Sequence, residues 1–308
     1  MKNKTSNIKS VLKSAIPDIF LAEFKPVVNG LRTFSARKRF ENAPKTPAWL
    51  GRDMLERLQK QYPFHLEYSW DLEHRRQRGE ERANELIRMI STRAEDIKNF
   101  LEIGCYDGMA SCALSRMGKA TTGIDITTKG FSEEVVKAGT ALLQMDACDM
   151  RFKDGQFDFV FSYNSFEHFP RPDKALLEAA RVVREGGYIY LFFGPLYMSP
   201  LGLHAYKTIT VPYCQFLFPG EMLKEFAAAG NLRHIEFEQL NYWSLEDYRR
   251  LWKRFSGRLR KVKYGEGADL SHLNLIEKYP SCFRNKTKCF DNLIISTIEV
   301  LFKKRRTE

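Results

Sequence analysis

The sequence predicts an α/β protein built on a doubly wound, mostly parallel sheet. Two observations support this fold class. Short apolar runs alternate with helical patterns between residues 99 and 193, and glycines stand where these runs end. Sheets of this type bind their ligands outside the carboxyl ends of the strands. The residues that follow each predicted strand are therefore the first candidates for a functional site.

A strand, a glycine-bearing turn, a helix and a second strand are predicted between residues 99 and 125. Asn99–Ile103 is short and apolar and ends at Gly104, and a helix opens at Gly108. Thr121–Ile124 is a second buried strand with Asp125 at its carboxyl end. Small residues let the backbone approach a nucleotide-like ligand, and an acid about 20 residues later can accept hydrogen bonds from ribose hydroxyls. This segment therefore indicates that the ligand is nucleotide-like and contains a ribose.

The same alternation continues along the chain. A third strand, a fourth strand, a helix and a fifth strand are predicted at Leu142–Asp146, Phe157–Ser162, Pro172–Glu185 and Tyr188–Phe193. Proline favours the first turn of a helix, and Gly186 and Gly187 mark the end of this one. Further along, Leu232–Leu240 alternates as a strand, and Asn292–Phe302 is a β-rich final strand.

Taken in order, these motifs resemble the class I S-adenosylmethionine-dependent methyltransferases, in the branch often called type 11. The first motif of that family reads acid-x-G-x-G-x-G. Glu102, Gly104 and Gly108 keep this pattern, and Tyr106 replaces the second glycine. An Asp-Ala pair after the third strand, a Glu-His pair after the fourth and Val-Val-Arg-Glu-Gly-Gly before the fifth complete the likeness. A dehydrogenase is disfavoured, because a dinucleotide fold requires G-x-G-x-x-G.

The resemblance implies a Rossmann-like sheet with an antiparallel last strand, and S-adenosylmethionine as the cofactor. In that family the Asp-Ala pair contacts the adenine. The cofactor-binding residues that the resemblance implies lie in or after the first four strands: Glu102, Gly104, Cys105, Tyr106, Gly108, Asp125, Asp146, Ala147 and Tyr163. The ring of Tyr106 has to point away from the methionine tail of the cofactor or to cover it.

Methyl transfer to an oxygen also requires the acceptor to lose a proton, so a nearby base is expected. Glu167 and His168 follow the fourth strand, and His204 lies in the segment after the fifth. These three residues are the catalytic candidates. The alternative for the histidines is a structural or binding role. No metal site is predicted, and the six cysteines, which form no C-x-x-C pair, are expected to be reduced thiols.

The chain is predicted to divide into an N-terminal arm and a methyltransferase-like domain. Residues 1–80 are interpreted as a helical and aromatic arm that caps the cofactor or substrate, and residues 81–308 as the domain. Two segments depart from the family pattern. Residues 194–219 form a long apolar connection, interpreted as a substrate lid. Residues 244–290 are interpreted as a basic insertion between the last two strands.

The net charge of +11 is unevenly distributed. Arg249–Lys263 is rich in Lys and Arg, contains no acid and interleaves these residues with apolar ones. Such a stretch predicts contact with an anionic membrane surface or with a phosphate-bearing substrate. The alternative is a solvated helix face. Nucleic acid is a less favoured partner, because no RNA-binding module is recognisable.

The sequence defines the acceptor least well. No apolar stretch is long enough for a spanning helix and no secretory signal is recognisable, so a cytoplasmic protein, or one peripheral to a membrane, is expected. The arm and lid are similar to those of methyltransferases that modify bacterial surface polysaccharides or sugars, which implies O-methylation of a glycosyl or other hydroxylated acceptor. The alternatives are RNA or a small metabolite as acceptor, and an inactive methyltransferase-like scaffold that binds a partner.

Overall fold

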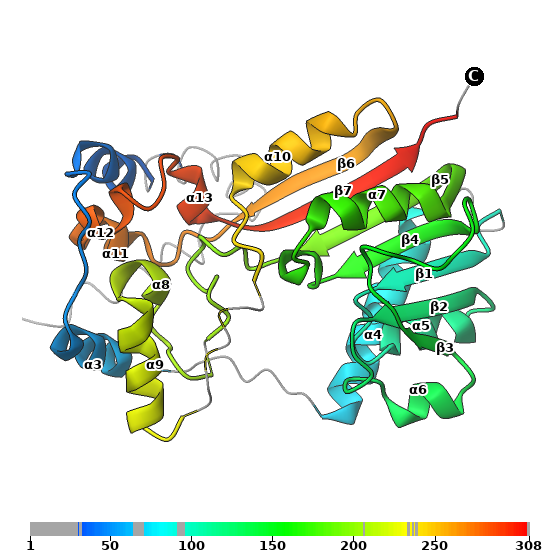
Figure 1. Ribbon diagram of the computed structural model, residues 1–308, viewed down its shortest axis with the longest axis horizontal. Helices are drawn as coiled ribbons and strands as arrows, with labels where there is room; N and C mark the ends of the chain where they lie inside the picture. Colours follow the sequence, from blue (N-terminus) through cyan, green and yellow to red (C-terminus); the bar gives the residue numbers. More distant parts are fainter. Residues whose placement is uncertain are drawn as a thin grey trace, which may run out of the picture. The chain divides into compact units, whose positions relative to one another are not determined.

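The computed structural model describes residues 30, 33–63, 71–90, 96–205, 207–232, 235, 237 and 240–306. Their central feature is a seven-stranded sheet in the order β3-β2-β1-β4-β5-β7-β6 (Figure 1). The strands are β1 (Asn99–Ile103), β2 (Ala120–Asp125), β3 (Ala141–Gln144), β4 (Phe157–Tyr163), β5 (Val183–Phe193), β6 (Leu259–Ala268) and β7 (Ile295–Lys304).

The sheet is parallel from β3 to β5 and antiparallel on its other side. β1 pairs in parallel with β2 and β4, as do β2 with β3 and β4 with β5. β7 runs antiparallel to β5, and β6 runs antiparallel to β7. The predicted α/β class, with its Rossmann-like sheet and antiparallel last strand, is confirmed. Because the first five strands are parallel, their carboxyl ends meet at one edge of the sheet, where ligands of such folds bind.

Helices connect these strands, and several begin at recognisable signals. Pro172 opens one of them, and Ser244 caps another while its backbone N–H donates to the Asp247 carboxylate. The helices are α3 (Arg52–Gln61), α4 (Leu72–Met89), α5 (Met109–Arg116), α6 (Glu133–Lys137), η2 (Phe166–His168), α7 (Pro172–Val182), α8 (Cys214–Leu217), α9 (Gly220–Ala229), α10 (Leu245–Arg254), α11 (Leu273–Lys278), α12 (Pro280–Arg284) and α13 (Asp291–Ile294).

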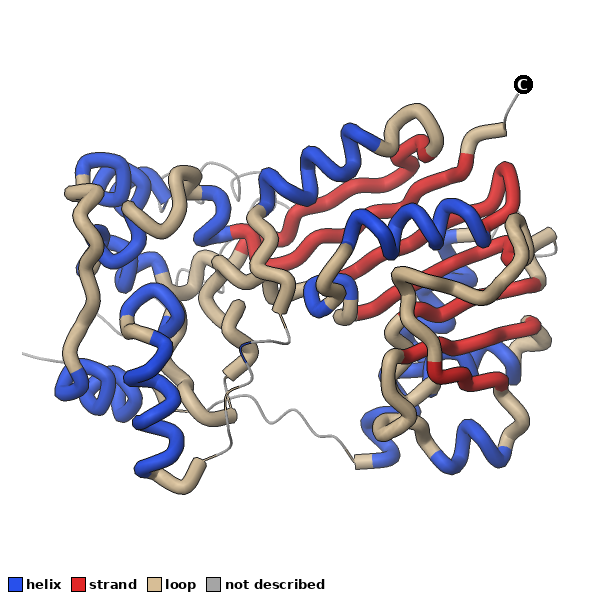
Figure 2. Tube along the Cα trace, viewed as in Figure 1, coloured by secondary structure: helices blue, strands red, loops and turns tan. Residues whose placement is uncertain are grey.

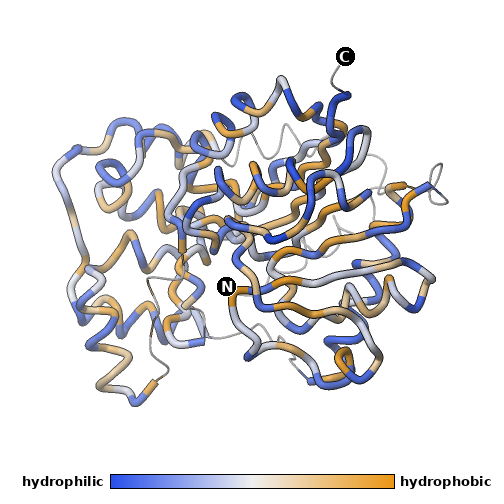
Figure 3. The backbone as a smooth tube through the Cα atoms, turned by 45° about the vertical axis from the view of Figure 1, so that its right-hand side comes forward, coloured by the Kyte–Doolittle hydropathy of each residue, from blue (hydrophilic) through white to orange (hydrophobic). Residues whose placement is uncertain are grey.

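Helices lie on both faces of the sheet (Figure 2), and a core cluster is packed on each face. Phe100 and Phe159 belong to the core cluster formed with α4 and α5. Leu101 and Val160, one residue further along the same strands, belong to the cluster formed with α7 and α10. Successive side chains of a strand point to opposite faces, so each strand supplies both clusters. Figure 3 shows the resulting run of hydrophobic residues along the central strands.

One predicted helix ends earlier than expected. The helix predicted at Pro172–Glu185 ends at Val182, because Val183 already pairs with Phe157 of β4 and begins β5. β5 is therefore longer than predicted by residues 183–187, which include the two glycines interpreted as a helix end.

The strand next to β7 was not predicted. The described residues of Leu232–Leu240 form no strand, and the remaining ones lie outside the described part of the chain. The neighbour of β7 is instead β6, within the segment interpreted as an insertion. β6 is the edge of the sheet and most of its residues are exposed. Edge strands commonly carry Lys and Arg, so the apolar alternation that reveals a half-buried strand is absent here.

The chain forms two compact units, and none of the three boundaries between them falls at residue 80, which lies inside α4. The larger unit contains Leu50–Asp269 and Asp291–Glu308 and holds the entire sheet. The smaller unit combines Met1–Trp49 with Leu270–Phe290. The segment 244–290 is therefore not a single insertion, because it contributes α10 and β6 to the sheet unit and α11 and α12 to the smaller unit.

Aromatic and cationic side chains join the two segments of the smaller unit. The ring of Phe40 meets the ring of Phe290 edge-on, with 5.8 Å between centroids. The guanidinium of Arg284 lies over the Phe40 ring at 5.1 Å, and the amino group of Lys286 lies 3.1 Å from the centroid of the Trp49 ring. Residues far apart in sequence thus share one small core.

The segment 194–219 is a hydrogen-bonded part of the sheet unit. The Leu196 N–H donates to the Ser296 carbonyl at 2.8 Å, and the Tyr213 hydroxyl donates to the Leu293 carbonyl at 2.7 Å. These bonds attach the predicted lid to the start of β7. No helix in the described residues is both long and apolar enough to cross a lipid bilayer.

Candidate functional site

The turn between β1 and α5 carries the glycines of the first motif. Gly104 and Gly108 have φ angles of +71° and +73°, a region that favours glycine. A Cβ at Gly104 would lie 2.5 Å from the Cβ of Ser165, and one at Gly108 would lie 2.7 Å from Cδ2 of Leu142. Both glycines are therefore required by the backbone conformation and by close packing against neighbouring segments.

Tyr106 replaces the second glycine of the motif without breaking the turn. It adopts a φ of +47°, and its backbone N–H donates to Oδ2 of Asp125 at 2.9 Å. Its ring lies against Gly130, where a Cβ would come within 2.6 Å of a ring carbon. The side chain is thus turned toward the loop after β2, and 53% of the residue is exposed.

Asp125 and Asp146 present carboxylates at the ends of β2 and β3. Asp125 accepts a second backbone hydrogen bond from Thr127 at 3.2 Å, and Asp146 accepts one from Cys148 at 2.7 Å. Asp146 is exposed, Asp125 is half-buried and Ala147 is buried. A carboxylate has about four acceptor positions, so both acids retain positions for the hydroxyl or amino groups of a ligand.

Three of the predicted cofactor-binding residues direct their side chains into the protein. Glu102 is buried and accepts hydrogen bonds from the Ser111 N–H and hydroxyl at 3.1 and 2.7 Å, and burial raises its pKa to about 7. Cys105 is buried, which raises the pKa of its thiol. The Tyr163 hydroxyl donates to Glu85 of α4 at 2.8 Å. The side chains of Glu102 and Tyr163 thus make contacts that support the turn and helix α4, and the cofactor contacts of all three residues stay a prediction.

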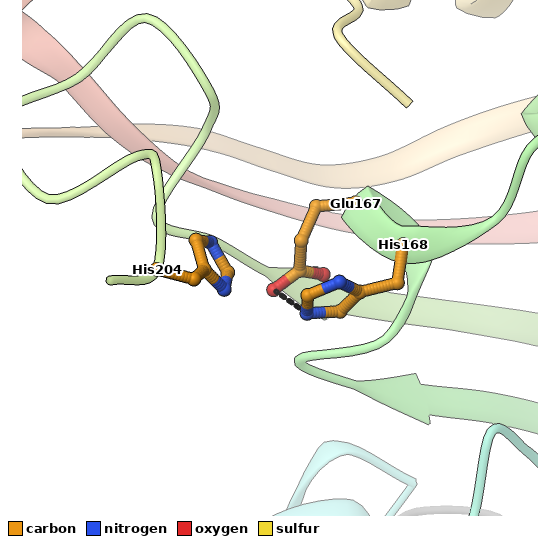
Figure 4. Close-up of side chains that lie close together, drawn as sticks. All are labelled: Glu167, His168 and His204. Carbon is orange, nitrogen blue, oxygen red and sulfur yellow. Dashed lines mark ion pairs between the residues drawn. The ribbon is translucent and has the colours of Figure 1, made fainter. Parts of the chain in front are cut away.

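The three predicted catalytic residues, Glu167, His168 and His204, come together beside the ends of β4 and β5 (Figure 4). Glu167 and His168 form η2 directly after β4, and His204 comes from the segment after β5. The two histidine rings are nearly perpendicular with 4.8 Å between centroids, and His168 Nε2 lies 4.0 Å from Glu167 Oε1. Tyr206, in the same segment as His204, lies outside the described residues.

Burial decides the protonation of two of these groups. Glu167 is only 3% exposed; its Oε1 accepts the Gly194 N–H at 3.1 Å, and burial raises its pKa to about 8. His204 Nε2 lies 2.8 Å from the Pro195 carbonyl oxygen. Burial, with a smaller contribution from His168, lowers the His204 pKa to about 4. His204 is therefore neutral at pH 7, and its Nε2–H donates to Pro195.

Asn241 holds η2 in place and was not among the predicted residues. Its backbone N–H donates to the Glu167 carbonyl at 3.1 Å, and its side-chain amide donates to the Phe166 carbonyl at 3.1 Å. The same side chain is hydrogen-bonded to the Tyr248 hydroxyl. A single asparagine in a loop has no sequence pattern that indicates such a contact.

The glycine turn and the Glu167–His168–His204 cluster are neighbours. Ser165, directly before η2, donates its hydroxyl to the Gly104 carbonyl at 2.8 Å. The residues of the first motif and the three acid and imidazole side chains therefore lie together at the carboxyl ends of β1, β4 and β5, which is the ligand edge of the sheet.

Comparison with known proteins identifies a methyltransferase domain and methyltransferase relatives. Residues 101–191 match the family model of a methyltransferase domain, Methyltransf_11. Over 171 residues the chain is 27% identical to the ubiquinone biosynthesis O-methyltransferase of Coxiella burnetii, covering 49% of this chain and 70% of that protein. Over 109 residues it is 37% identical to the fatty-acid O-methyltransferase of Mycolicibacterium smegmatis, covering 33% and 40%. The solved structure of the YcgJ protein from Bacillus subtilis has a TM-score of 0.44 at 18% identity, covering 74% of this chain and 99% of that one.

The sheet, its glycine turn and the match over residues 101–191 define a class I methyltransferase domain. The protein is an S-adenosylmethionine-dependent methyltransferase. The residues present suit this cofactor, because the positive-φ turn brings backbone to the ligand edge and the carboxylates of Asp125 and Asp146 retain acceptor positions for a nucleoside.

Proposed function

We propose that this methyltransferase transfers the methyl group to an oxygen of its acceptor at the Glu167–His168–His204 cluster. Bound S-adenosylmethionine supplies a methyl group on a sulfonium. As the acceptor oxygen bonds to the methyl carbon, the carbon–sulfur bond breaks, and a hydroxyl acceptor also loses its proton. The observation that carries the proposal is the position of three proton-accepting side chains beside the Gly104 turn.

The cluster is suited to receive a hydroxyl group. Glu167 has a pKa raised to about 8, close to the neutral range in which a general base works best. His204 donates through Nε2 to Pro195, so its Nδ1 carries a lone pair that can accept a hydrogen bond. Holding the acceptor oxygen in line with the methyl group lowers the barrier further, because orientation alone is worth several kcal/mol.

An oxygen acceptor is also supported by the names of the two relatives, both of which are O-methyltransferases. Neither is named for a sugar, so a glycosyl acceptor is one class to test beside phenols and carboxylic acids. Wild-type protein is incubated with isotopically labelled S-adenosylmethionine and a panel of these acceptors, with RNA and amines as controls. Transfer only to nitrogen would contradict the proposal. A protein that does not bind S-adenosylhomocysteine would be the inactive scaffold.

We propose a second role, binding of a phosphate-bearing anion, for basic residues at the opposite end of the sheet. Three arginines of the basic helix α10 are paired with acids. Arg249 pairs with Glu266 at 2.6 Å, Arg250 pairs with Asp247, and Arg254 lies 3.7 Å from an acid of α7. The cationic side chains suited to an anion are therefore those at the start of β6 and the end of β7.

These residues surround a surface hollow of about 360 Å³. Its lining consists of a glycine and cationic residues: Gly186, Arg260, Lys303, Lys304, Arg305 and Arg306. Lys303 and Arg306 also line an adjoining hollow of about 230 Å³ together with Arg184. Both hollows lie where β5 begins and β7 ends, at the other end of the sheet from the methyl-transfer site. Clustered cations of this kind attract phosphate groups.

A further inference from the structure

We propose that Glu167, His168 and His204 bind one divalent cation, which in turn binds the acceptor oxygen. Each residue offers one ligand atom, and these three atoms all lie within 4.8 Å of one another. One carboxylate and two imidazoles form the ligand set of many catalytic zinc and non-haem iron sites, which keep positions open for substrate. The role of the ion in activating the acceptor rests on the proposed function, whereas the binding of the ion to these three side chains does not.

The carboxylate of Glu167 supplies the first argument. Its Oε1 accepts the Gly194 N–H, while its Oε2 is buried and has no hydrogen-bond partner among the described residues. A buried carboxylate oxygen without a partner is strongly unfavourable unless it carries a proton or binds a cation. The two imidazoles beside it provide the remaining ligands, so a cation satisfies this oxygen where the protein does not.

His204 supplies the second argument, because it is held as metal-binding histidines are held. Its Nε2–H donates to the Pro195 carbonyl at 2.8 Å, which leaves Nδ1 as the nitrogen with a lone pair. A hydrogen bond from one ring nitrogen to a carbonyl typically fixes the tautomer and orientation of a metal ligand. In Figure 4 the carboxylate of Glu167 lies between the two imidazole rings.

The distances suit a small ion after a modest adjustment. Ligands about 2.1 Å from one ion are at most about 4.2 Å apart. His168 Nε2 and Glu167 Oε1, at 4.0 Å, already meet this limit, while a pair at 4.8 Å has to close by about 0.6 Å. The side chain of His168 is 34% exposed, so it has more room to adjust than the buried Glu167. Two imidazoles favour Zn²⁺, Fe²⁺ or Co²⁺ over Mg²⁺.

A cation at this place gives the cluster a defined way to activate the acceptor. A bound metal lowers the pKa of a coordinated water strongly, and a coordinated hydroxyl group is affected in the same direction. Its proton then leaves to solvent, and Glu167 acts as a ligand instead of as the proton acceptor. The ion also fixes the acceptor oxygen beside the Gly104 turn, where the first motif positions the cofactor.

The test measures metal binding by the full chain in the absence of any acceptor. Protein stripped with a chelator is titrated with Co²⁺ in the presence of S-adenosylhomocysteine, and the visible absorption of the ion is recorded. We expect one Co²⁺ per chain in a four- or five-coordinate nitrogen and oxygen site, displaced by Zn²⁺. His204→Ala and Glu167→Gln should each weaken binding by more than about 100-fold, because even groups behind a ligand change affinity by about 10–100-fold.

The matched control is His74→Ala, which removes an exposed histidine that pairs with Asp71 far from the cluster in sequence. This variant should bind Co²⁺ as the wild type does. Binding of S-adenosylhomocysteine reports the fold of each variant, and His168→Ala replaces His204→Ala if the latter does not fold. The inference is overturned if the wild type binds S-adenosylhomocysteine but neither Co²⁺ nor Zn²⁺. It is also overturned if a folded variant of Glu167, His168 or His204 binds the metal as tightly as the wild type does. In either case Glu167 is a protonated acid. Metal binding without transfer to any oxygen acceptor supports the cation site and contradicts the proposed function.

Discussion

The backbone N–H of Gly194 donates a hydrogen bond of 3.1 Å to Oε1 of Glu167. Gly194 directly follows β5 and Glu167 closely follows β4, so the bond holds this carboxylate between the ends of two neighbouring parallel strands. The position of Glu167 is therefore set by the sheet and by Asn241, which accounts for a buried acid at a ligand-binding edge. Sites supported by strands hold their geometry better than sites on loops.

Gly104→Val should abolish binding of S-adenosylhomocysteine and lower the free energy of unfolding by about 2–4 kcal/mol. The new Cβ would meet Ser165 at 2.5 Å, and the backbone has a φ of +71°. Gly118→Val is the matched control, because Gly118 has a φ of +80° but no atom within 4 Å of its Cβ position. The control should lose about 1–2 kcal/mol and keep cofactor binding. Chemical denaturation and calorimetry measure both effects, and equal losses in the two variants would contradict the packing argument.

Asp125→Ala should raise the dissociation constant of S-adenosylhomocysteine by about 5- to 150-fold, since hydrogen bonds to a charged group contribute about 1–3 kcal/mol. The substitution removes the acceptors for a ribose and also the bond from the Tyr106 N–H at 2.9 Å. Asp53→Ala, at an exposed position in α3, should leave the constant unchanged. An unchanged constant for Asp125→Ala, measured by calorimetry, would remove Asp125 from the cofactor site.

Glu167→Gln and His168→Ala should lower turnover strongly, by about 100-fold or more, with S-adenosylhomocysteine binding nearly intact. His204→Ala, assayed with saturating divalent cation, should mainly raise the Michaelis constant of the acceptor, as expected for lost binding shared by ground and transition states. Glu221→Gln, at an exposed position, is the control. Steady-state kinetics with an identified acceptor make the comparison. Wild-type turnover in both Glu167→Gln and His168→Ala would exclude these two residues from the chemical step.

The stability of the protein should fall with rising pH because of Glu102. Burial raises the pKa of this acid from 4.5 to about 7. The unfolded chain releases the proton near pH 4.5 and the folded chain near pH 7, so between these values the folded state binds more protons and loses stability as pH rises. Glu102→Gln should reduce the pH-dependent decrease in the free energy of unfolding by up to about 3 kcal/mol. Urea unfolding of both proteins between pH 4.5 and 8 measures it, and parallel pH profiles would refute the assignment.

Reversing Arg260 and Arg306 to Glu should abolish binding to vesicles that contain anionic phospholipid, while S-adenosylhomocysteine binding stays unchanged. Binding by the wild type should fall steeply with added salt, because exposed charges are screened. Arg250→Glu is the control, because Arg250 is already paired with Asp247 outside the hollow. Vesicle sedimentation, repeated with free pyrophosphate as competitor, distinguishes binding to a lipid surface from binding to a soluble phosphate. Salt-independent binding, or none to either ligand, would favour a solvated basic surface.

The strands at the centre of the sheet were predicted closely, and the strand at its edge was not. Asn99–Ile103 was predicted with the bounds that β1 has, and Phe157–Ser162 differs from β4 by one residue. Central parallel strands are covered on both faces and read as continuous apolar runs. β6 has a solvent-facing edge and carries cations, so its pairing with β7 has no counterpart in local hydrophobicity.

Local sequence was sufficient to predict the α/β class, the glycine turn, the methyltransferase domain and the three candidate residues of the acceptor site. These features depend on apolar runs, turn residues and short motifs, which act over a few neighbouring residues. The partners of those residues depended on tertiary structure. Only the packed sheet brings His204 to Glu167, places Asn241 behind η2, pairs Arg249 with Glu266 and buries Glu102 against Ser111. These contacts join segments far apart in the chain, and burial, which shifts the pKa values of Glu167 and His204, exists only once the strands and helices have assembled.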